Sequence, residues 1–269
     1  MSQKVIRIDF AYDGTRYKGY QIQKNDPTIQ GELEKALEKI YKTPVTTFAA
    51  GRTDTGVHAV HQVASYKTAS PIPLLGVKKA LRSLLPQDIF VYEVSEAEAT
   101  FHARFSPLKR SYLYVIFNGA EPSPFSRLYS WWVPRKLSLF KLRRTLKILK
   151  GEHDFSSFTQ RSEKENHIRT LYKIKVKKRK QFIFILIQGN SFLRRMIRLL
   201  VGTAVGITEC KTLKPSALKT ILELKNRGEN PFTAAPGGGL FFYRVHFKGK
   251  DFLDTRGWGK GNVGPFKVN

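Results

Sequence analysis

The alternation of apolar and polar positions divides the chain into a repeated order of strands and helices. Near the N-terminus, Ile6, Ile8 and Phe10 alternate with charged residues, which predicts a strand over residues 4–12. Asp26-Pro27 is typical of a helix start, with the acid as N-cap, and apolar residues then recur at helical spacing. The same reasoning predicts strands over residues 46–50 and 60–66, a helix over 74–85 and a strand over 89–94.

The second half repeats this order with insertions. Periodicity predicts a strand over residues 111–117, a basic helix over 139–149, a hairpin of strands 169–177 and 182–188, helices over 192–205 and 216–224, and a strand over 239–247. The hairpin is expected to turn at Lys178-Arg179-Lys180. Two ferredoxin-like βαββαβ units give an α+β protein with largely antiparallel sheets. We expect a first unit over residues 1–105, a second over 106–250, and a flexible, basic, glycine-rich tail over 251–269.

The charge of the chain indicates a polyanionic partner. Its 47 Lys and Arg against 21 Asp and Glu give a formal net charge of +26, which favours nucleic acid or an anionic membrane surface. No apolar run reaches the roughly 18 residues of a spanning helix, and the N-terminus lacks the apolar core of a secretory signal. Cys210 is the only cysteine, which excludes an intramolecular disulfide and a cysteine-based zinc site. RNA or DNA in the cytoplasm is therefore the expected partner.

An acid stands in a glycine-flanked turn between two predicted strands. Gly51 and Gly56 permit a sharp bend that leaves Asp54 at its tip, two residues after Arg52. A carboxylate on such a turn suits catalysis. It also suits an Asx turn, in which Asp54 only bonds its own loop.

Four segments together resemble a known family. The residues Gly51-Arg52-Thr53-Asp54-Thr55-Gly56-Val57-His58-Ala59 resemble the signature of the TruA family of tRNA pseudouridine synthases. Three further segments resemble the other blocks of that family in the same order: 101–105 with 110–114, 191–202 and 236–242. The resemblance spans residues 1 to about 248, nearly the whole chain.

The resemblance implies an activity and a role for each site residue. It implies isomerisation of uridine to pseudouridine at positions 38, 39 and 40 of the tRNA anticodon stem-loop, with base flipping and without cofactor or metal. Asp54 would be the nucleophile, attacking either the base or the sugar, and Arg198 would hold its carboxylate ionised. Arg52 would fill the vacated stack, Tyr112 would lie against the target base, and Leu240 would line the pocket.

Further residues are expected to contact the RNA. Arg194 and Arg195 share the predicted polar face of the 192–205 helix with Arg198, and Phe101 opens the second block. The expected RNA-contacting residues are Phe101, His102, Ala103, Arg104, Phe105, Arg169, Arg194 and Arg195. The resemblance also implies a homodimer in which one tRNA contacts both subunits.

Other classes of function compete with this interpretation. Asp54, His58 and His61 could form a metal triad, but no fourth ligand is visible and a turn entering a strand explains their spacing. A non-catalytic RNA-binding protein with two RRM-like units shares the order of elements, but no strand carries the RRM aromatic motif. A metal-dependent nuclease lacks its acidic cluster. Val60-His61 departs from the small, less polar residues usual in the family before Gln62.

Overall fold

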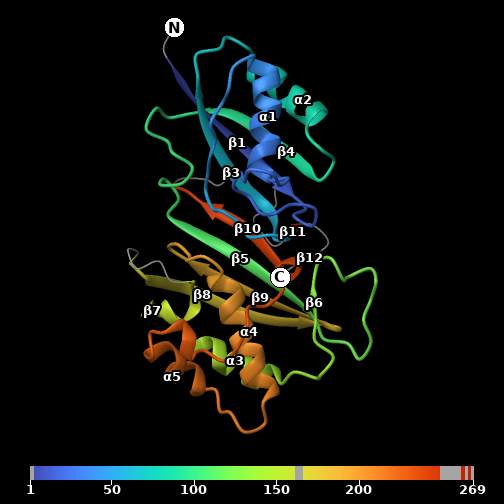
Figure 1. Ribbon diagram of the computed structural model, residues 1–269, viewed down its shortest axis with the longest axis vertical. Coiled ribbons are helices and arrows are strands. Elements are labelled where there is room, and N and C mark those ends of the chain that lie inside the picture. The colour runs from blue at the N-terminus through green and yellow to red at the C-terminus, as the bar shows by residue number, and fades with distance from the viewer. Residues whose placement is uncertain (1–2, 161–165, 249–261, 264–265, 268–269) are drawn as a thin grey trace. The chain divides into compact units, whose positions relative to one another are not determined.

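The chain folds into two compact units of mixed α and β structure. The computed structural model describes residues 3–160, 166–248, 262–263 and 266–267. One unit consists of Met1–Leu108 together with Phe242–Asn269, and the other of Lys109–Phe241. The strands pair almost entirely in antiparallel fashion, which confirms the α+β prediction (Figure 1).

The first unit has the strand-helix-strand-strand-helix-strand order expected from the periodicity. Its elements are β1 (Lys4–Tyr12), α1 (Ile29–Tyr41), β2 (Phe48–Ala49), β3 (His58–Thr68), α2 (Leu74–Leu84) and β4 (Ile89–Ala97). β1 lies between β3 and β4, antiparallel to both, and β2 pairs with the middle of β3. The closing strand β10 (Leu240–His246) adjoins β3, so from Phe242 onward the chain belongs to this unit.

Helix α1 begins later than the sequence indicates. Asp26 was expected as N-cap, but Thr28 caps the helix, its hydroxyl accepting a hydrogen bond from the Gly31 amide at 3.2 Å. Both Asp26 and Pro27 are exposed and lie outside the helix. Thr28 is buried, so its hydroxyl satisfies an amide that water does not reach easily, and the helix starts at the next residue, Ile29.

A buried ionic network ties β1 to β3. Asp9 receives two hydrogen bonds from Arg7, at 2.8 and 2.7 Å, and a third from Nε2 of His61 at 2.8 Å. Burial by itself raises the pKa of Asp9, but the hydrogen bonds from His61 and Arg7 and the charge of Arg7 outweigh it and hold that pKa below its ordinary value. The guanidinium of Arg7 lies 4.6 Å from the ring centre of Phe247, which joins the network to the chain after β10.

The second unit is built on a sheet of four strands in the order β5-β9-β8-β7. Its elements are β5 (Lys109–Phe117), β6 (Trp131–Trp132), α3 (Leu139–Lys147), β7 (Gly151–Asp154), β8 (Ile168–Arg179), β9 (Phe182–Gly189), α4 (Met196–Glu209) and α5 (Ala217–Glu223). β6 runs parallel to β5 at its end. Short 3-10 helices cover Ser156–Phe158, Arg227–Glu229 and Gly237–Gly239. The hairpin turns at Lys180-Gln181 rather than at 178–180, because β8 stays paired with β9 through Arg179.

The predicted two-faced helix over residues 192–205 is wrong in its start and in its character. α4 begins at Met196, after Arg195 adopts a left-handed φ of 61°, so Arg194 and Arg195 precede the helix. Eleven of its 14 residues are buried, which leaves no broad polar face. The periodicity of Leu193, Met196 and Ile197 made the helix appear to start too early.

The C-terminal segment is described only in part. Residues Asn262–Val263 (β11) and Phe266–Lys267 (β12) pair as two short antiparallel strands. The remainder of the expected flexible tail over 251–269 lies outside the described residues. No helix in the described ranges is long and apolar enough to cross a membrane.

Candidate active site

Asp54 lies on a short loop that connects β2 to β3 in the first unit. The loop is anchored at its start, where the Ala50 amide donates to the carbonyl of Val63 at 2.8 Å. It closes on itself where the Val57 amide donates to the carbonyl of Asp54 at 3.1 Å. Gly56 takes the left-handed φ of 72° that the turn was expected to need, whereas Gly51 does not. Asp54 is half-buried and Arg52 is exposed.

A second loop, residues 13–20, holds the Asp54 loop from the side. The amide of Tyr20 donates to the carbonyl of Thr53 at 3.0 Å, and the amide of Gly56 donates to the carbonyl of Tyr17 at 3.3 Å. These two bonds fix the backbone on both sides of Asp54. We call residues 13–20 the cradle loop.

Two glycines let the cradle loop approach this closely. A Cβ on Gly14 would lie 2.0 Å from the carbonyl oxygen of Val57, and one on Gly19 would lie 2.8 Å from that of Thr53. Gly19 also has a φ of 102°, which L side chains rarely adopt. The contact between the two loops is therefore a backbone-to-backbone contact that leaves no room for a side chain.

Buried side chains of β1 and β3 also hold the Asp54 loop. The hydroxyl of Tyr12 lies 2.8 Å from Oγ1 of Thr53, and Nε2 of Gln62 donates to the carbonyl of Gly51 at 2.8 Å. Burial raises the pKa of Tyr12 to about 12, although hydrogen bonds with Thr53 and Gln62 lower it, so this phenol stays protonated at neutral pH. The Asp54 loop is thus held both by the cradle loop and by buried side chains. A catalytic group needs such support, because it must be held in one position.

The two histidines after the loop are each engaged elsewhere. Nδ1 of His58 lies 3.1 Å from the Gly14 amide and 3.0 Å from Oδ1 of Asp13, and His61 binds Asp9. Within the described residues no group of three His, Cys, Asp or Glu could hold a metal ion. His61, which departs from the family pattern, belongs to the Arg7–Asp9 network because its Nε2 binds Asp9.

The other candidate site residues belong to the second unit. Tyr112 on β5 is 8% exposed, and its ring meets that of Phe192 edge-on at 5.0 Å between centres. Leu240, the first residue of β10, is 5% exposed. Nε of Arg198, in the first turn of α4, donates to the carbonyl of Ala235 at 2.7 Å, while the Ala235 amide donates back to the Arg198 carbonyl at 2.9 Å. Arg198 is thereby locked to the segment that leads into Pro236–Leu240.

The expected RNA-contacting residues differ in their exposure. In the first unit Ala103 is buried and its amide donates to Oγ of Ser65 at 3.0 Å, which anchors the 101–105 segment. Arg104 and Phe105 project from that anchor, with the guanidinium 5.3 Å from the ring centre. The ring of His102 contacts those of Phe48 and Phe105, at 4.7 and 4.6 Å between centres. Desolvation and then the charges of Arg104 and Lys67 lower the pKa of His102, although a backbone hydrogen bond raises it.

In the second unit, Arg194 and Arg195 are exposed just before α4. Arg169 is half-buried, and its Nη1 donates to the carbonyls of Asn166 and Ile168, at 2.6 and 2.7 Å. Among the contacts of the described residues, the side chains of Arg194 and Arg195 make no such hydrogen bond to the backbone. They are therefore more available for a ligand than that of Arg169.

Comparison with known proteins decides the family. The sequence pattern of the family described as tRNA pseudouridine synthase matches residues 10–106 and 146–248. This chain belongs to that family. "tRNA pseudouridine synthase A" of Pseudothermotoga lettingae is 44% identical over 241 residues, covering 88% of this chain and 97% of the relative. The protein of the same name from Thermotoga maritima is 40% identical over 246 residues, covering 91% and 100%.

A solved structure, "Crystal Structure of a Cbf5-Nop10-Gar1 Complex", aligns with a TM-score of 0.36 at 12% identity, covering 91% of this chain and 58% of that one. Membership of the family makes this synthase an isomerase that acts on tRNA. It also gives the chain the pseudouridine synthase fold that the resemblance implied.

Sequence reasoning missed the part of the synthase that positions the Asp54 loop. Tyr12, Gly14, Gly19 and Gln62 contact that loop, and none of them was singled out. The run Tyr12-Asp13-Gly14-Thr15 after a strand does signal a turn. The residues that the turn packs against, such as Thr53 at 41 residues from Tyr12, leave no local signal.

Proposed function

We propose that this synthase converts uridines 38, 39 and 40 of the tRNA anticodon stem-loop to pseudouridine, with Asp54 as the nucleophile, and that it acts in the cytoplasm. The observation that carries the assignment is the way the Asp54 loop is held. Backbone bonds from the cradle loop and side-chain bonds from Tyr12 and Gln62 fix a half-buried carboxylate on a turn. A surface Asx turn would not need support from both directions.

The reaction breaks one bond to the ribose and makes another. The bond from N1 of uracil to C1′ breaks, the base rotates, C5 bonds to C1′, and the proton on C5 is lost while N1 gains one. Asp54 assists by attacking either the sugar or the base, and the covalent adduct collapses when the new bond forms. Tyr112 takes part as a stacking surface and as a proton acceptor for C5. Leu240 lines the pocket with an apolar surface that limits water at the glycosidic bond.

Arg198 is assigned the role of orienting the carboxylate. A guanidinium paired with Asp54 keeps the acid ionised and fixes its direction. The hydrogen bond from Arg198 Nε to the carbonyl of Ala235 supports this role, because it holds the guanidinium in one place.

Flipping of the target base is assigned to Arg52. A uridine in a stem is stacked and paired, so extruding it costs a few kcal/mol. Arg52 is exposed two residues before Asp54, so it can occupy the space that the base vacates. The 101–105 segment and Arg194 and Arg195 contact the flanking RNA in this proposal, with Arg169 at the edge of the surface.

The nucleophile is tested by Asp54→Asn. Its pseudouridine formation, followed by tritium release from 5-tritiated uridine tRNA, should fall below about a tenth of the wild-type rate, with tRNA affinity within a few-fold. Arg198→Ala should be nearly as damaging. If Asp54→Asn turns over faster than that limit, the loop is only a turn and the assignment is wrong.

Arg52→Ala separates flipping from chemistry. Its turnover should fall most on uridines paired in the stem and least on an unstacked loop uridine, because only the paired base needs its extruded state stabilised. Equal losses on both substrates would contradict the role. Tyr112→Phe, which keeps the ring, should lower turnover more than affinity.

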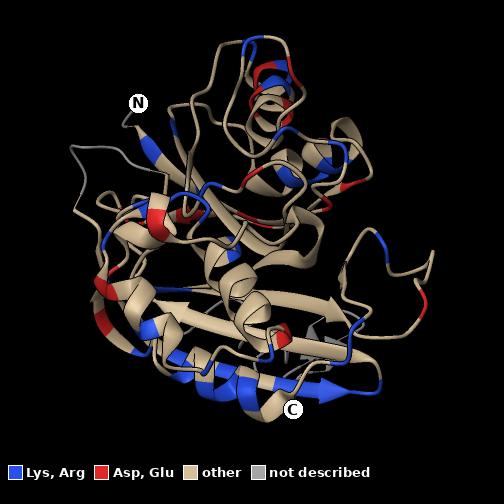
Figure 2. Cartoon of the chain, turned by 60° about the horizontal axis from the view of Figure 1, so that its bottom comes forward, with Lys and Arg blue, Asp and Glu red and all other residues tan. Residues whose placement is uncertain are grey.

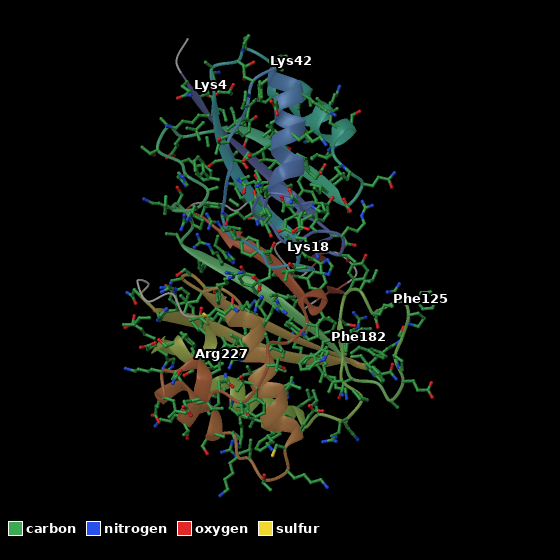
Figure 3. All side chains as sticks on the ribbon, viewed as in Figure 1. Lys4, Lys18, Lys42, Phe125, Phe182 and Arg227 are labelled. Carbon is green, nitrogen blue, oxygen red and sulfur yellow. The ribbon has the colours of Figure 1, made fainter. Side chains whose placement is uncertain are left out.

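We also infer a homodimer. The inference rests on the family resemblance and on exposed aromatic side chains, since Phe125 is 93% and Trp132 40% exposed and Phe125 projects from the ribbon (Figure 3). Sedimentation at micromolar concentration should give about twice the chain mass of 30.8 kDa. A single species at the chain mass would refute the dimer.

A further inference from the structure

One edge of the second unit carries exposed cations on two neighbouring elements. Figure 2 shows lysines and arginines along α3 and along β8 at the same side of the molecule. We call this surface the basic edge and define it by six exposed residues: Arg143, Arg144, Lys147, Lys173, Lys175 and Arg179.

The two elements are held together at the open side of β8. β7 pairs with β8 only from Ile168 to Leu171, so the later part of β8 has no strand beside it on that side within the described residues. There Nε of Arg143 donates to the carbonyl of Val176 at 3.1 Å. α3 therefore lies against the edge of β8, and its cations and those of the strand form one surface.

Nothing on these elements neutralises the charge. Residues 122–151 and 166–208 contain no Asp or Glu. None of the six cations is paired with a carboxylate in the part of the chain that the structure describes. An ordinary solvated surface mixes both signs, as α1 does with Lys35 and Lys39 among Glu34 and Glu38. Cations gathered without acids repel one another, so a polyanion that binds them is favoured.

The spacing of the cations on β8 suits a phosphate backbone. Lys173, Lys175 and Arg179 lie on one face of the strand, because side chains two residues apart point the same way, about 7 Å apart. From Lys173 to Arg179 the row is about 20 Å long, the length of about six phosphates along one strand of a duplex. An exposed aromatic ring lies beside the charges of α3, since Phe140 is 70% exposed and its ring centre is 5.3 Å from the guanidinium of Arg144.

The basic edge is separate from the residues assigned to the target base. Within this unit β9 stands between β8 and β5, which puts β8 about 10 Å from the strand that carries Tyr112. None of the four family-like segments includes α3 or β8. The cations of the basic edge therefore lie on other elements than the residues assigned to the target base.

We propose that the basic edge binds the phosphate backbone of tRNA outside the anticodon arm. The proposal rests on tRNA being the substrate but not on Asp54 being the nucleophile. Its function is to add affinity for the whole tRNA fold, so that an isolated anticodon stem-loop is bound more weakly than the full molecule.

The test is a triple variant, Lys173→Gln, Lys175→Gln and Arg179→Gln, measured by filter binding against salt. Full-length tRNA should bind about 10- to 100-fold more weakly, and the log-log salt slope should fall by up to about 3, near one for each phosphate that the variant no longer binds. Binding of the isolated anticodon stem-loop should change less than twofold or so, because it does not reach the edge. The turnover number at saturating tRNA should stay at the wild-type value while KM rises.

Two controls isolate the effect. Replacing Lys35 and Lys39 of α1 and its C-cap Lys42 by Gln removes the same charge from a surface of mixed sign, and should leave the salt slope nearly unchanged. Lys173→Arg with Lys175→Arg keeps the charge and should keep full affinity. Equal losses for full tRNA and stem-loop, or no loss for either, would overturn the proposal. Neither result bears on Asp54→Asn, so the two proposals fail independently.

Discussion

Gly14→Ala should separate the position of Asp54 from its chemistry. Gly14 has a φ open to any residue, so alanine strains no backbone angle there. The added Cβ would lie 2.0 Å from the carbonyl oxygen of Val57, and ordinary contact is near 3.5 Å, so the two loops must separate by about 1.5 Å. Because the Val57 amide bonds the carbonyl of Asp54, that movement reaches the carboxylate.

A misplacement of this size costs about 100-fold in turnover, and the overpacking costs about 1 to 3 kcal/mol of stability. Turnover at saturating tRNA is measured by tritium release, with thermal unfolding and tRNA affinity alongside. Gly76→Ala, in α2, is the matched control, because the added Cβ would meet only the side chain of Ile72, at 3.9 Å. This variant should keep full activity and stability. A folded Gly14→Ala enzyme with turnover within about threefold of wild type would show that the cradle loop does not position the nucleophile.

Three further changes test the first unit. The lowered pKa of Asp9 contributes stability above the unfolded-state pKa near 3.9, and that contribution is lost as pH falls from there through the folded-state pKa. The free energy of unfolding of Asp9→Asn in urea should therefore approach that of wild type as pH falls from 6 to 3. A difference that stays constant with pH would contradict this. Thr28→Ala should lower the free energy of unfolding in urea by about 1 kcal/mol, because the α1 cap is lost, whereas Thr28→Ser should keep most of the wild-type stability. Tyr12→Phe should cost about 1 kcal/mol by removing the hydroxyl that meets Thr53, and a change in stability without any fall in turnover would argue against its positioning role.

The sequence predicted elements best where one periodicity held without competition. β1 was predicted with its observed limits, because Ile6, Ile8 and Phe10 alternate cleanly with charges. α4 was misjudged because Leu193 continues its apolar period upstream, while Arg194 and Arg195 resemble a polar face although they precede the helix.

The turn that carries Asp54 was predicted better than the contacts around it. Asp54 stands on a turn with a left-handed glycine, as expected from Gly56. The hydrogen bond between Arg198 and Ala235 spans 37 residues, and the contact between Gly14 and Val57 spans 43; neither leaves a local pattern in the chain. Long-range backbone contacts of this kind depend on the whole fold.

The return of the chain to its first unit has a consequence for synthesis on the ribosome. Leu108 leaves that unit and Phe242 re-enters it, so the second unit is an insertion within the first. Until β10 emerges, β3 has only the two-residue strand β2 beside it on that side, and the Leu108 amide lacks the carbonyl of His246 that it bonds at 2.8 Å. The first unit to be translated is thus the last to be completed. A nascent or truncated chain that stops before Phe242 exposes a strand edge that can pair with another copy and aggregate.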